Sequence, residues 1–511
     1  MPDAEGVQKG EPKILRWDGP VPLPPVPDTN YASFLLNIML QHGEKLALVD
    51  ARTGKYHTYG DIYRAVPRIK AGLAAAGVSQ GDALLLMSSN HIDFPLVLLA
   101  TVLAGAICVP VSPTLKPDEL ALLARASGAR WAVAHESLAP VMQEAFGQLP
   151  PGTLRQLWVL GSAPRLPSLA NLMRSGPSPD GHAQEMIDSR TTVALMMFSS
   201  GTTGPPKGVM LSHRNLLTSL LQNKYLKSLS PPGTPNVLES TLLVIPVFHT
   251  YGYIILVNTI LMGGKAVMMA RFSPERYFEA IQTHKVTFSP IVPHIAMYLA
   301  KTPLMSKYDT SSLLAFASGT SPLAPSTHVE LMQKTGKGAG IGYGMTEACA
   351  TIASNGGSLG FQLGSVGKLL PYYEGKVVDV ETGQILGEGQ EGEVCVRGPS
   401  IMLGYMGNPK ATAEVLDAEG WLHTGDLGFF DQDNFIFLTD RIKDLMKVKG
   451  YQVAPSEIEK IVREVEGVAD VTVVGVPDDR LGEAPRAWVV PAPGASLDPA
   501  HIQQHVAGVS L

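Results

Sequence analysis

The chain has 511 residues, more than a single hydrophobic core usually serves, so two or more domains are expected. A net charge of −6 without a long basic block excludes a surface built to bind nucleic acid. The three widely spaced cysteines, Cys108, Cys349 and Cys395, indicate neither a disulfide framework nor a zinc site and suit a reducing compartment.

The N-terminal part shows no export signal and no transmembrane segment. Residues 1–19 are mostly polar and lack an apolar signal core. The longest apolar run, residues 94–109, contains Gly105 and is shorter than a bilayer span requires. Residues 20–27 hold five prolines and are expected to follow the surface in an extended form. We therefore expect a cytoplasmic protein, with a peroxisomal location as the alternative.

Strands and helices alternate over most of the chain, which predicts an α/β fold. Helical patterns at 58–76 and 94–104 flank an apolar strand at 83–87, and further strands follow at 109–111 and 131–134. The same rhythm returns at 241–246, 277–283 and 285–291. It predicts parallel sheets covered on both faces, in two layered halves.

The texture changes after residue 375. Short strands at 376–380 and 392–397 lie between glycine turns, which predicts a small β-barrel. Beyond 443, Ser456 and Glu459 form a capping-box pattern at the start of a helix, and strands follow at 471–476 and 487–490. This last part predicts a small α+β C-terminal domain.

A loop rich in glycine and hydroxyl groups follows an apolar run at 193–198, and a helical pattern begins at Ser212. Freely turning backbone N–H groups, side-chain hydroxyls and one ammonium group form an anion site. The spacing differs from the common P-loop, and a flexible linker is the alternative. We predict a loop that binds the phosphates of a nucleotide, comprising Ser199, Ser200, Gly201, Thr202, Thr203, Gly204 and Lys207.

At these residues the chain resembles the adenylate-forming superfamily, which includes acyl-CoA synthetases, aryl-CoA ligases such as 4-coumarate-CoA ligase, and beetle luciferases. The resemblance covers about residues 30–505. It implies an ATP-dependent acyl- or aryl-CoA ligase that uses Mg²⁺ and coenzyme A: a carboxylate and ATP give acyl-AMP and pyrophosphate, and CoA then releases AMP. A luciferase-like oxygenase and a non-catalytic acyl or nucleotide binder remain as alternatives. The oligomeric state is expected to be monomer or homodimer.

Residues 342–347 form a second glycine-rich motif. Glycines let the backbone approach a flat ligand, an aromatic ring offers a face for a base, and a carboxylate can hold Mg²⁺. An ordinary turn with a solvated carboxylate is the alternative. The resemblance implies that Gly342, Tyr343 and Gly344 contact adenine, that Thr346 faces the α-phosphate, and that Glu347 binds the metal.

A histidine follows the apolar strand at 241–246. Such a histidine is more often a core residue, but the resemblance places His249 beside the substrate carboxylate, as a catalytic residue, and Tyr251 in the pocket wall. Tyr253, Gly319, Thr320 and Gly344 are expected in the same pocket. Relatives commonly have glycine or alanine where Thr320 and Ser321 stand, which makes this pocket more polar or shallower.

The last motifs follow residue 420. The resemblance implies that Asp426 and Arg441 contact the ribose, since one carboxylate matches two vicinal hydroxyls. For the basic stretch 440–453, the resemblance implies that Lys443 is the hinge about which a mobile C-terminal domain rotates. It also implies that Gly450 lies on the path of the CoA pantetheine, and that Lys447 and Gln452 face the active site during adenylation. A solvated basic strip is the alternative. The expected domains are 1–439, a hinge at 440–443, and 444–511.

One feature of the family is missing from this chain. Relatives carry a further segment with a Gly-Lys pair whose lysine reaches the α-phosphate, but no lysine follows Lys460 here. Either this chain is a shortened form, or adenylation is weak and some other cation compensates. This departure is what keeps the binder alternative open.

Overall fold

The computed structural model describes residues 11–20, 22–175, 187–199, 206–448, 451–478, 480–492 and 494–507; for residues 451 and 452 it describes the backbone alone. The chain divides into two compact units. We call Arg16–Glu374 with Arg397–Gly420 the large unit, and Met1–Leu15 with Gly375–Val396 and Trp421–Leu511 the small unit. Across the described ranges, no helix is long and apolar enough to cross a membrane.

A seven-stranded sheet organises the first half of the large unit, and its central strands are parallel. Side chains alternate between its faces: Leu84 and Leu86 enter one core cluster, while Leu85 and Met87 enter another. The sheet is therefore buried on both faces, as predicted. In spatial order its strands are β19 (Gly404–Tyr405), β9 (Lys207–Ser212), β8 (Val193–Ser199), β5 (Ile107–Val111), β4 (Ala83–Met87), β6 (Trp131–His135) and β7 (Gln156–Leu160).

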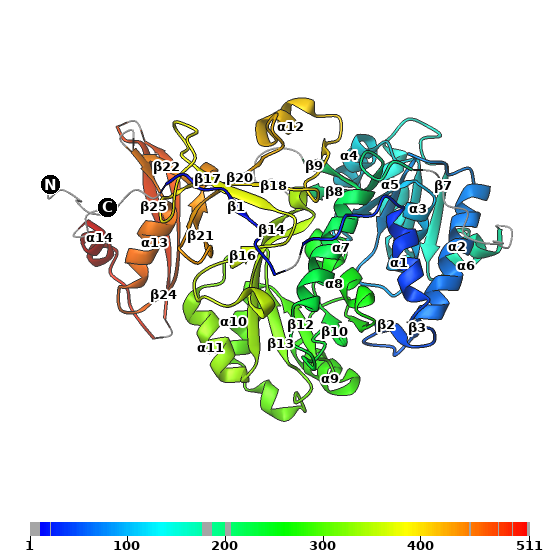
Figure 1. The fold of residues 1–511 in the computed structure, drawn as a ribbon, viewed down its shortest axis with the longest axis horizontal. Helices are drawn as coiled ribbons and strands as arrows, with labels where there is room; N and C mark the ends of the chain where they lie inside the picture. Colours follow the sequence, from blue (N-terminus) through cyan, green and yellow to red (C-terminus); the bar gives the residue numbers. More distant parts are fainter. Residues whose placement is uncertain are drawn as a thin grey trace. The chain divides into compact units, whose positions relative to one another are not determined.

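Helices cover both faces of this sheet (Figure 1). A capping box between Thr58 and Asp61 begins one of them, and Gly128 in the left-handed conformation ends another. One face carries α1 (Tyr31–Met39), α2 (Tyr59–Ala75), α3 (Phe94–Leu103) and α6 (Leu169–Ser175), and the other carries α4 (Pro117–Ser127) and α5 (Ala139–Gly147).

A nine-stranded sheet organises the second half of the large unit. Its middle strands are parallel, and β14 turns back into the antiparallel β15. In order its strands are β16 (Lys368–Leu369), β15 (Ala350–Asn355), β14 (Gly338–Met345), β13 (Ala315–Ser318), β12 (Phe288–Ile291), β10 (Ser240–Leu243), β11 (Lys265–Met268), β2 (Leu46–Asp50) and β3 (Tyr56–Thr58). Helices α7 (His213–Ser228), α8 (Thr250–Leu261), α9 (Pro274–His284), α10 (Pro293–Lys301) and α11 (Pro325–Thr335) share its core.

The chain around the predicted phosphate loop differs from the expectation in one respect. We expected the loop to connect a strand directly to a helix, but β9 lies between them and pairs antiparallel with β8. Residues 209–211 supply apolar side chains that complete the sheet, and Ser212 then caps α7. The loop thus connects two strands of a hairpin.

The small unit contains two sheets. One has the order β1 (Leu15–Arg16), β17 (Glu374–Val378), β18 (Gly392–Arg397), β20 (Leu422–Phe430) and β21 (Ile436–Arg441), and it stands where the small barrel was expected. The other has the order β23 (Tyr451–Val453), β22 (Met446–Val448), β25 (Gly482–Pro491) and β24 (Val468–Asp478), and one of its faces packs on α13 (Pro455–Arg463) and α14 (Pro499–Ala507). The domain boundary at 439 and the hinge stay predictions.

The predicted capping box at Ser456 is wrong. Helix α13 begins two residues earlier than this pattern implies, with Ala454 rather than Ser456 at its N-cap, because Pro455 favours the first helical position. The Ser456 hydroxyl instead donates to the Thr439 carbonyl at 3.2 Å, and the Glu459 carboxylate accepts from the Val473 amide at 2.9 Å. Both side chains therefore bind neighbouring segments of the small unit.

The burial of His213 predicts that the stability of the large unit depends on pH. It is fully buried, and its Nδ1 accepts the Tyr31 amide at 3.0 Å. Burial lowers its pKa from 6.5 to about 4. Between these values the unfolded chain binds a proton that the folded chain does not, so the free energy of unfolding decreases as the pH decreases, by on the order of 3 kcal/mol in all.

Chemical denaturation at pH 7 and pH 5 measures this effect. His213→Asn keeps an acceptor for the Tyr31 amide but does not titrate, so we expect it to lose about 2 kcal/mol less than the wild type between the two pH values. Equal losses in the two proteins would refute the assignment to His213.

Candidate active site

The two ends of the predicted phosphate loop face each other in the β8–β9 hairpin. Ser199, the last residue of β8, pairs with Lys207, the first residue of β9. The predicted loop residues Ser200, Gly201, Thr202, Thr203 and Gly204 lie outside the described residues. Of the predicted loop residues, the structure therefore describes Ser199 and Lys207.

Glu347 is a buried carboxylate beside this hairpin. It lies in η3 (Thr346–Ala348), a turn of 3-10 helix directly after β14, and the residue is 6% exposed. Its Oε1 accepts a hydrogen bond of 2.8 Å from the Tyr405 hydroxyl, and its backbone carbonyl accepts one of 2.8 Å from the Met402 amide. Across the described ranges no hydrogen bond reaches Oε2, so this oxygen is available to a ligand.

Tyr405 contacts both charged residues predicted to act on the phosphates, Lys207 and Glu347. Its ring centroid lies 4.9 Å from Lys207 Nζ, and its hydroxyl binds Glu347. Burial beside the Glu347 carboxylate raises the pKa of Tyr405 well above its usual value, so the hydroxyl keeps its proton and is the donor. The sequence analysis missed this residue. The one local signal is the preceding glycine, Gly404, whose φ of +136° few other residues adopt.

The predicted adenine segment is closely packed. A Cβ on Gly344 would lie 1.6 Å from the carbonyl oxygen of Ala350, so the β14–β15 turn requires glycine there. The strands shift register between Tyr343 and Gly344, and Cys349 and Ala350 both have positive φ values, of 55° and 85°. This backbone conformation presents Thr346 and Glu347 at the end of β14.

Several predicted pocket residues meet at the ends of β13 and β14. The Tyr251 hydroxyl donates to the Ala317 carbonyl at 2.9 Å, and its ring would lie 3.3 Å from a Cβ on Gly319. The same Cβ would lie 3.4 Å from the Gly342 carbonyl oxygen. One residue before Tyr251, the Thr250 hydroxyl lies 3.5 Å from that of Thr346. This arrangement connects the predicted pocket wall to the predicted phosphate side.

The remaining pocket residues differ in their surroundings. His249 is the N-cap residue of α8, and although its side chain reaches solvent, the protein around its other sides lowers its pKa. Thr320 is exposed and has a φ of +76°. Tyr253 is buried and its hydroxyl donates to the Tyr31 hydroxyl at 3.0 Å, within the core. Neutral His249 and exposed Thr320 are thus available to a ligand, while the Tyr253 hydroxyl already has a partner.

The two predicted ribose residues pair with each other in the small unit. Asp426 of β20 and Arg441 of β21 are cross-strand partners, and Arg441 Nε lies 3.0 Å from Asp426 Oδ1. The Asp426 side chain is 8% exposed and that of Arg441 is 51% exposed. The guanidinium therefore fixes the orientation of a nearly buried carboxylate.

Glu393, Cys395 and His423 lie next to the turn that precedes Asp426. Their ligand atoms all lie within 4.8 Å of one another, so they could hold a metal ion. His423 Nδ1 lies 2.7 Å from Glu393 Oε2, and Glu393 Oε1 accepts the Gly425 amide at 3.0 Å. Glu393 therefore contacts both the His423 ring and the turn before Asp426. The cluster is explained by this support of the turn that carries Asp426. No sequence pattern pointed to Glu393.

The other residues of the basic stretch are placed only in part. Lys443 is exposed in η5 (Ile442–Asp444), and Lys447 is exposed on β22, where its amide donates to Glu483 at 2.6 Å. Lys447 pairs with Gln452 of β23 in register, and the Gln452 side chain is outside the description. Gly450 lies outside the described residues.

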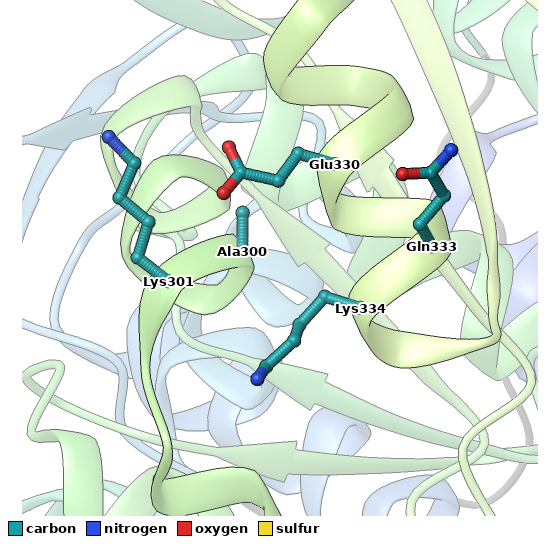
Figure 2. A pocket seen from close by; sticks show the side chains of 5 residues that line it. All are labelled: Ala300, Lys301, Glu330, Gln333 and Lys334. Atoms are coloured by element: carbon teal, nitrogen blue, oxygen red, sulfur yellow. The ribbon is translucent and has the colours of Figure 1, made fainter.

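The surface of the large unit also has two hollows that contain none of the predicted site residues. One, of about 520 Å³, lies between α10 and α11 and is lined by Ala300, Lys301, Glu330, Gln333 and Lys334. Figure 2 shows the ammonium groups of Lys301 and Lys334 pointing in different directions, so they do not converge on one ligand. The other, of about 530 Å³, includes His57, Arg64, Arg68 and Asp93.

The residues around Glu347 fit a Mg²⁺ ion. Mg²⁺ prefers oxygen ligands and is commonly held by one or two carboxylates together with substrate phosphates. Glu347 supplies one carboxylate oxygen that the described residues leave free, and the other is held by Tyr405. A hydrogen-bonded carboxylate of this kind is the usual form of a metal ligand in proteins.

Comparison with known proteins agrees with these motifs. A family model described as AMP-binding enzyme matches residues 38–406, and one described as AMP-binding enzyme C-terminal domain matches residues 457–510. The chain is 36% identical to 4-coumarate–CoA ligase 5 of Oryza sativa subsp. japonica over 481 residues, which cover 91% of this chain and 85% of that protein. It is 35% identical to peroxisomal OPC-8:0-CoA ligase 1 of Arabidopsis thaliana over 495 residues, 96% and 88% of the two chains.

A solved structure agrees with the same assignment. ATP-bound MatB from Rhodopseudomonas palustris superimposes with a TM-score of 0.84 at 28% identity, covering 95% of this chain and 93% of that one. The predicted superfamily and fold class are thereby confirmed. The chain belongs to the AMP-binding enzyme family, and it is an ATP-dependent acyl- or aryl-CoA ligase.

Proposed function

We propose that Lys207, Thr346 and Glu347 act on the phosphates of ATP while an organic acid is adenylated. The position of Glu347 supports this most directly, because its buried carboxylate and the Lys207 ammonium group both contact Tyr405. The second oxygen of this carboxylate makes no hydrogen bond to the described residues and is not enclosed by them, so a cation can reach it, which favours a metal-binding role. We assign Mg²⁺ to Glu347, and phosphate contacts to Lys207 and to Thr346.

The reaction has two steps, adenylation of the acid and formation of the thioester. A substrate carboxylate oxygen attacks the α-phosphorus of ATP, a P–O bond forms, and the bond to pyrophosphate breaks. The thiolate of CoA then attacks the acyl carbon and AMP leaves. Glu347 would hold Mg²⁺, which would neutralise phosphate charge. Lys207 adds a second positive charge, and holding the reactants in line lowers the barrier further because orientation replaces a bimolecular encounter.

The pocket residues hold the acid in this proposal. Neutral His249 faces the substrate carboxylate, where it offers a hydrogen bond without a competing charge. Tyr251, Gly319 and Gly342 lie close together and form a flat wall, which suits an aromatic or extended acyl chain. Thr320 adds an exposed hydroxyl to this side. We infer that the substrate is a carboxylic acid with an aryl or extended acyl chain. The rice and Arabidopsis relatives are named for acids, 4-coumarate and OPC-8:0.

The residues of the small unit are assigned to the nucleoside and to CoA. Asp426, oriented by Arg441, accepts hydrogen bonds from the ribose hydroxyls. Lys443 is the hinge within the predicted segment 440–443, Gly450 lies on the pantetheine path, and Lys447 and Gln452 turn toward the acid during adenylation. We further propose a cytoplasmic location and a monomer or homodimer.

Pyrophosphate release tests the proposal. The protein is incubated with ATP, Mg²⁺ and single acids from a panel of cinnamic-type, medium-chain and long-chain carboxylic acids, with and without CoA. We expect release with at least one acid, and a thioester only when CoA is present. ATP binding without release for every acid would refute the proposal and favour a non-catalytic binder.

A further inference from the structure

We propose that Tyr405 is a positioning residue that holds the Glu347 carboxylate for Mg²⁺ through its hydroxyl and the Lys207 ammonium group through its ring. The inference rests on the proposed function, because it concerns the same phosphate site. Tyr405 belongs to neither of the motifs it connects: it lies 198 residues beyond Lys207 and 58 residues beyond Glu347.

The backbone of Tyr405 is fixed from both sides. In β19 it pairs with Val209 of β9, only two residues from Lys207. The amides on either side donate to the same strand, Leu403 to Met210 at 2.9 Å and Met406 to Gly208 at 2.8 Å. On its other side the Tyr405 amide donates to the hydroxyl of Thr412, in α12 (Pro409–Val415), at 2.9 Å. Tyr405 therefore moves with the strand that carries Lys207.

The hydroxyl and the ring have separate functions. The hydroxyl donates to Glu347 Oε1 at 2.8 Å, which fixes the rotation of the carboxylate and leaves the second oxygen for the metal. The ring face lies 4.9 Å from Lys207 Nζ, within the range of a cation–π contact. In the part of the chain that the structure describes, Lys207 forms no ion pair. Its charge is thus oriented by a neutral ring and stays available to phosphate.

Two substitutions separate these functions. Tyr405→Phe removes the hydroxyl and keeps the ring, whereas Tyr405→Leu removes both. Tyr277→Phe is the matched control, because Tyr277 is also buried and its hydroxyl also donates a hydrogen bond, of 2.7 Å to Ser289 in β12. Thermal unfolding of all three variants checks that the fold is kept.

ATP binding, titrated calorimetrically with Mg²⁺ and with EDTA, is the main measurement. We expect Tyr405→Phe to reduce the strengthening of ATP binding by Mg²⁺ about tenfold or more, as for other residues that support metal ligands, and to leave binding in EDTA within about twofold of wild type. Tyr405→Leu should in addition weaken binding in EDTA a few-fold, since the ammonium group loses its support. Tyr277→Phe should change neither value.

A double-mutant cycle decides whether Tyr405 acts through Glu347. In a Glu347→Gln background, Tyr405→Phe should cause no further loss of the Mg²⁺ effect. The inference would be overturned if Tyr405→Phe changed the Mg²⁺ effect no more than Tyr277→Phe does. It would also be overturned if Tyr405→Phe reduced the Mg²⁺ effect as strongly in the Glu347→Gln background as in the wild type. A wild type that binds ATP but releases no pyrophosphate refutes the proposed function alone, because the titrations still decide the role of Tyr405. A wild type that binds no ATP refutes both.

Discussion

Glu347→Gln is expected to abolish adenylate formation with little loss of stability. Glutamine keeps the volume and an oxygen that accepts from the Tyr405 hydroxyl, but it lacks the charge that holds a cation. Metal stabilisation of transferring phosphoryl groups amounts to several kcal/mol, so the rate of pyrophosphate release should fall roughly a thousandfold. The rate is measured in a single turnover at saturating ATP, and the melting temperature is measured on the same preparation.

The control is a glutamate remote from the site. Glu119 at the start of α4 is exposed and accepts the Lys116 amide at 2.8 Å. Glu119→Gln should leave pyrophosphate release unchanged. If Glu347→Gln also released pyrophosphate at the wild-type rate, Glu347 would not be the metal ligand. A collapse of its melting temperature would instead show that the carboxylate serves the fold.

Gly344→Ala is expected to destabilise the large unit, by about 3 kcal/mol or more. The added methyl group would lie 1.6 Å from the carbonyl oxygen of Ala350 and 2.6 Å from its carbonyl carbon, so strand β15 must move away. Because Glu347 lies between these two strands, activity should fall together with stability. Urea denaturation followed by circular dichroism measures the free energy of unfolding.

Gly342→Ala, two residues earlier on the same strand, is the matched control for stability. A Cβ there meets nothing within 4 Å, and the strand backbone accepts alanine. Its free energy of unfolding should stay within about 0.5 kcal/mol of wild type. Similar losses for the two alanine variants would mean that glycine at 344 is not required by the packing, and that backbone freedom alone explains both.

The sequence predicted the elements whose patterns are local. The apolar strands at 83–87 and 193–198 and the alternation of strands with helices were correct, because burial on both faces of a parallel sheet leaves a continuous apolar run. The motif at 342–347 was found for a similar reason: glycines that allow close approach are visible in the sequence, and Gly344 meets Ala350 as that requires. The errors were at boundaries. Strand β9 and the start of α13 depend on partners that the local pattern does not contain.

By itself, the sequence determined the family and the α/β class. It also predicted the charged residues of a phosphate site, because glycine, hydroxyl and carboxylate groups at fixed spacing carry that chemistry wherever the chain runs. Only the tertiary structure decided that one tyrosine joins two of those motifs. Tyr405, Lys207 and Glu347 meet because β19 pairs with β9 while the Met402 amide binds the Glu347 carbonyl. Such contacts depend on how strands distant in sequence pair, and no pattern within a single segment specifies that pairing.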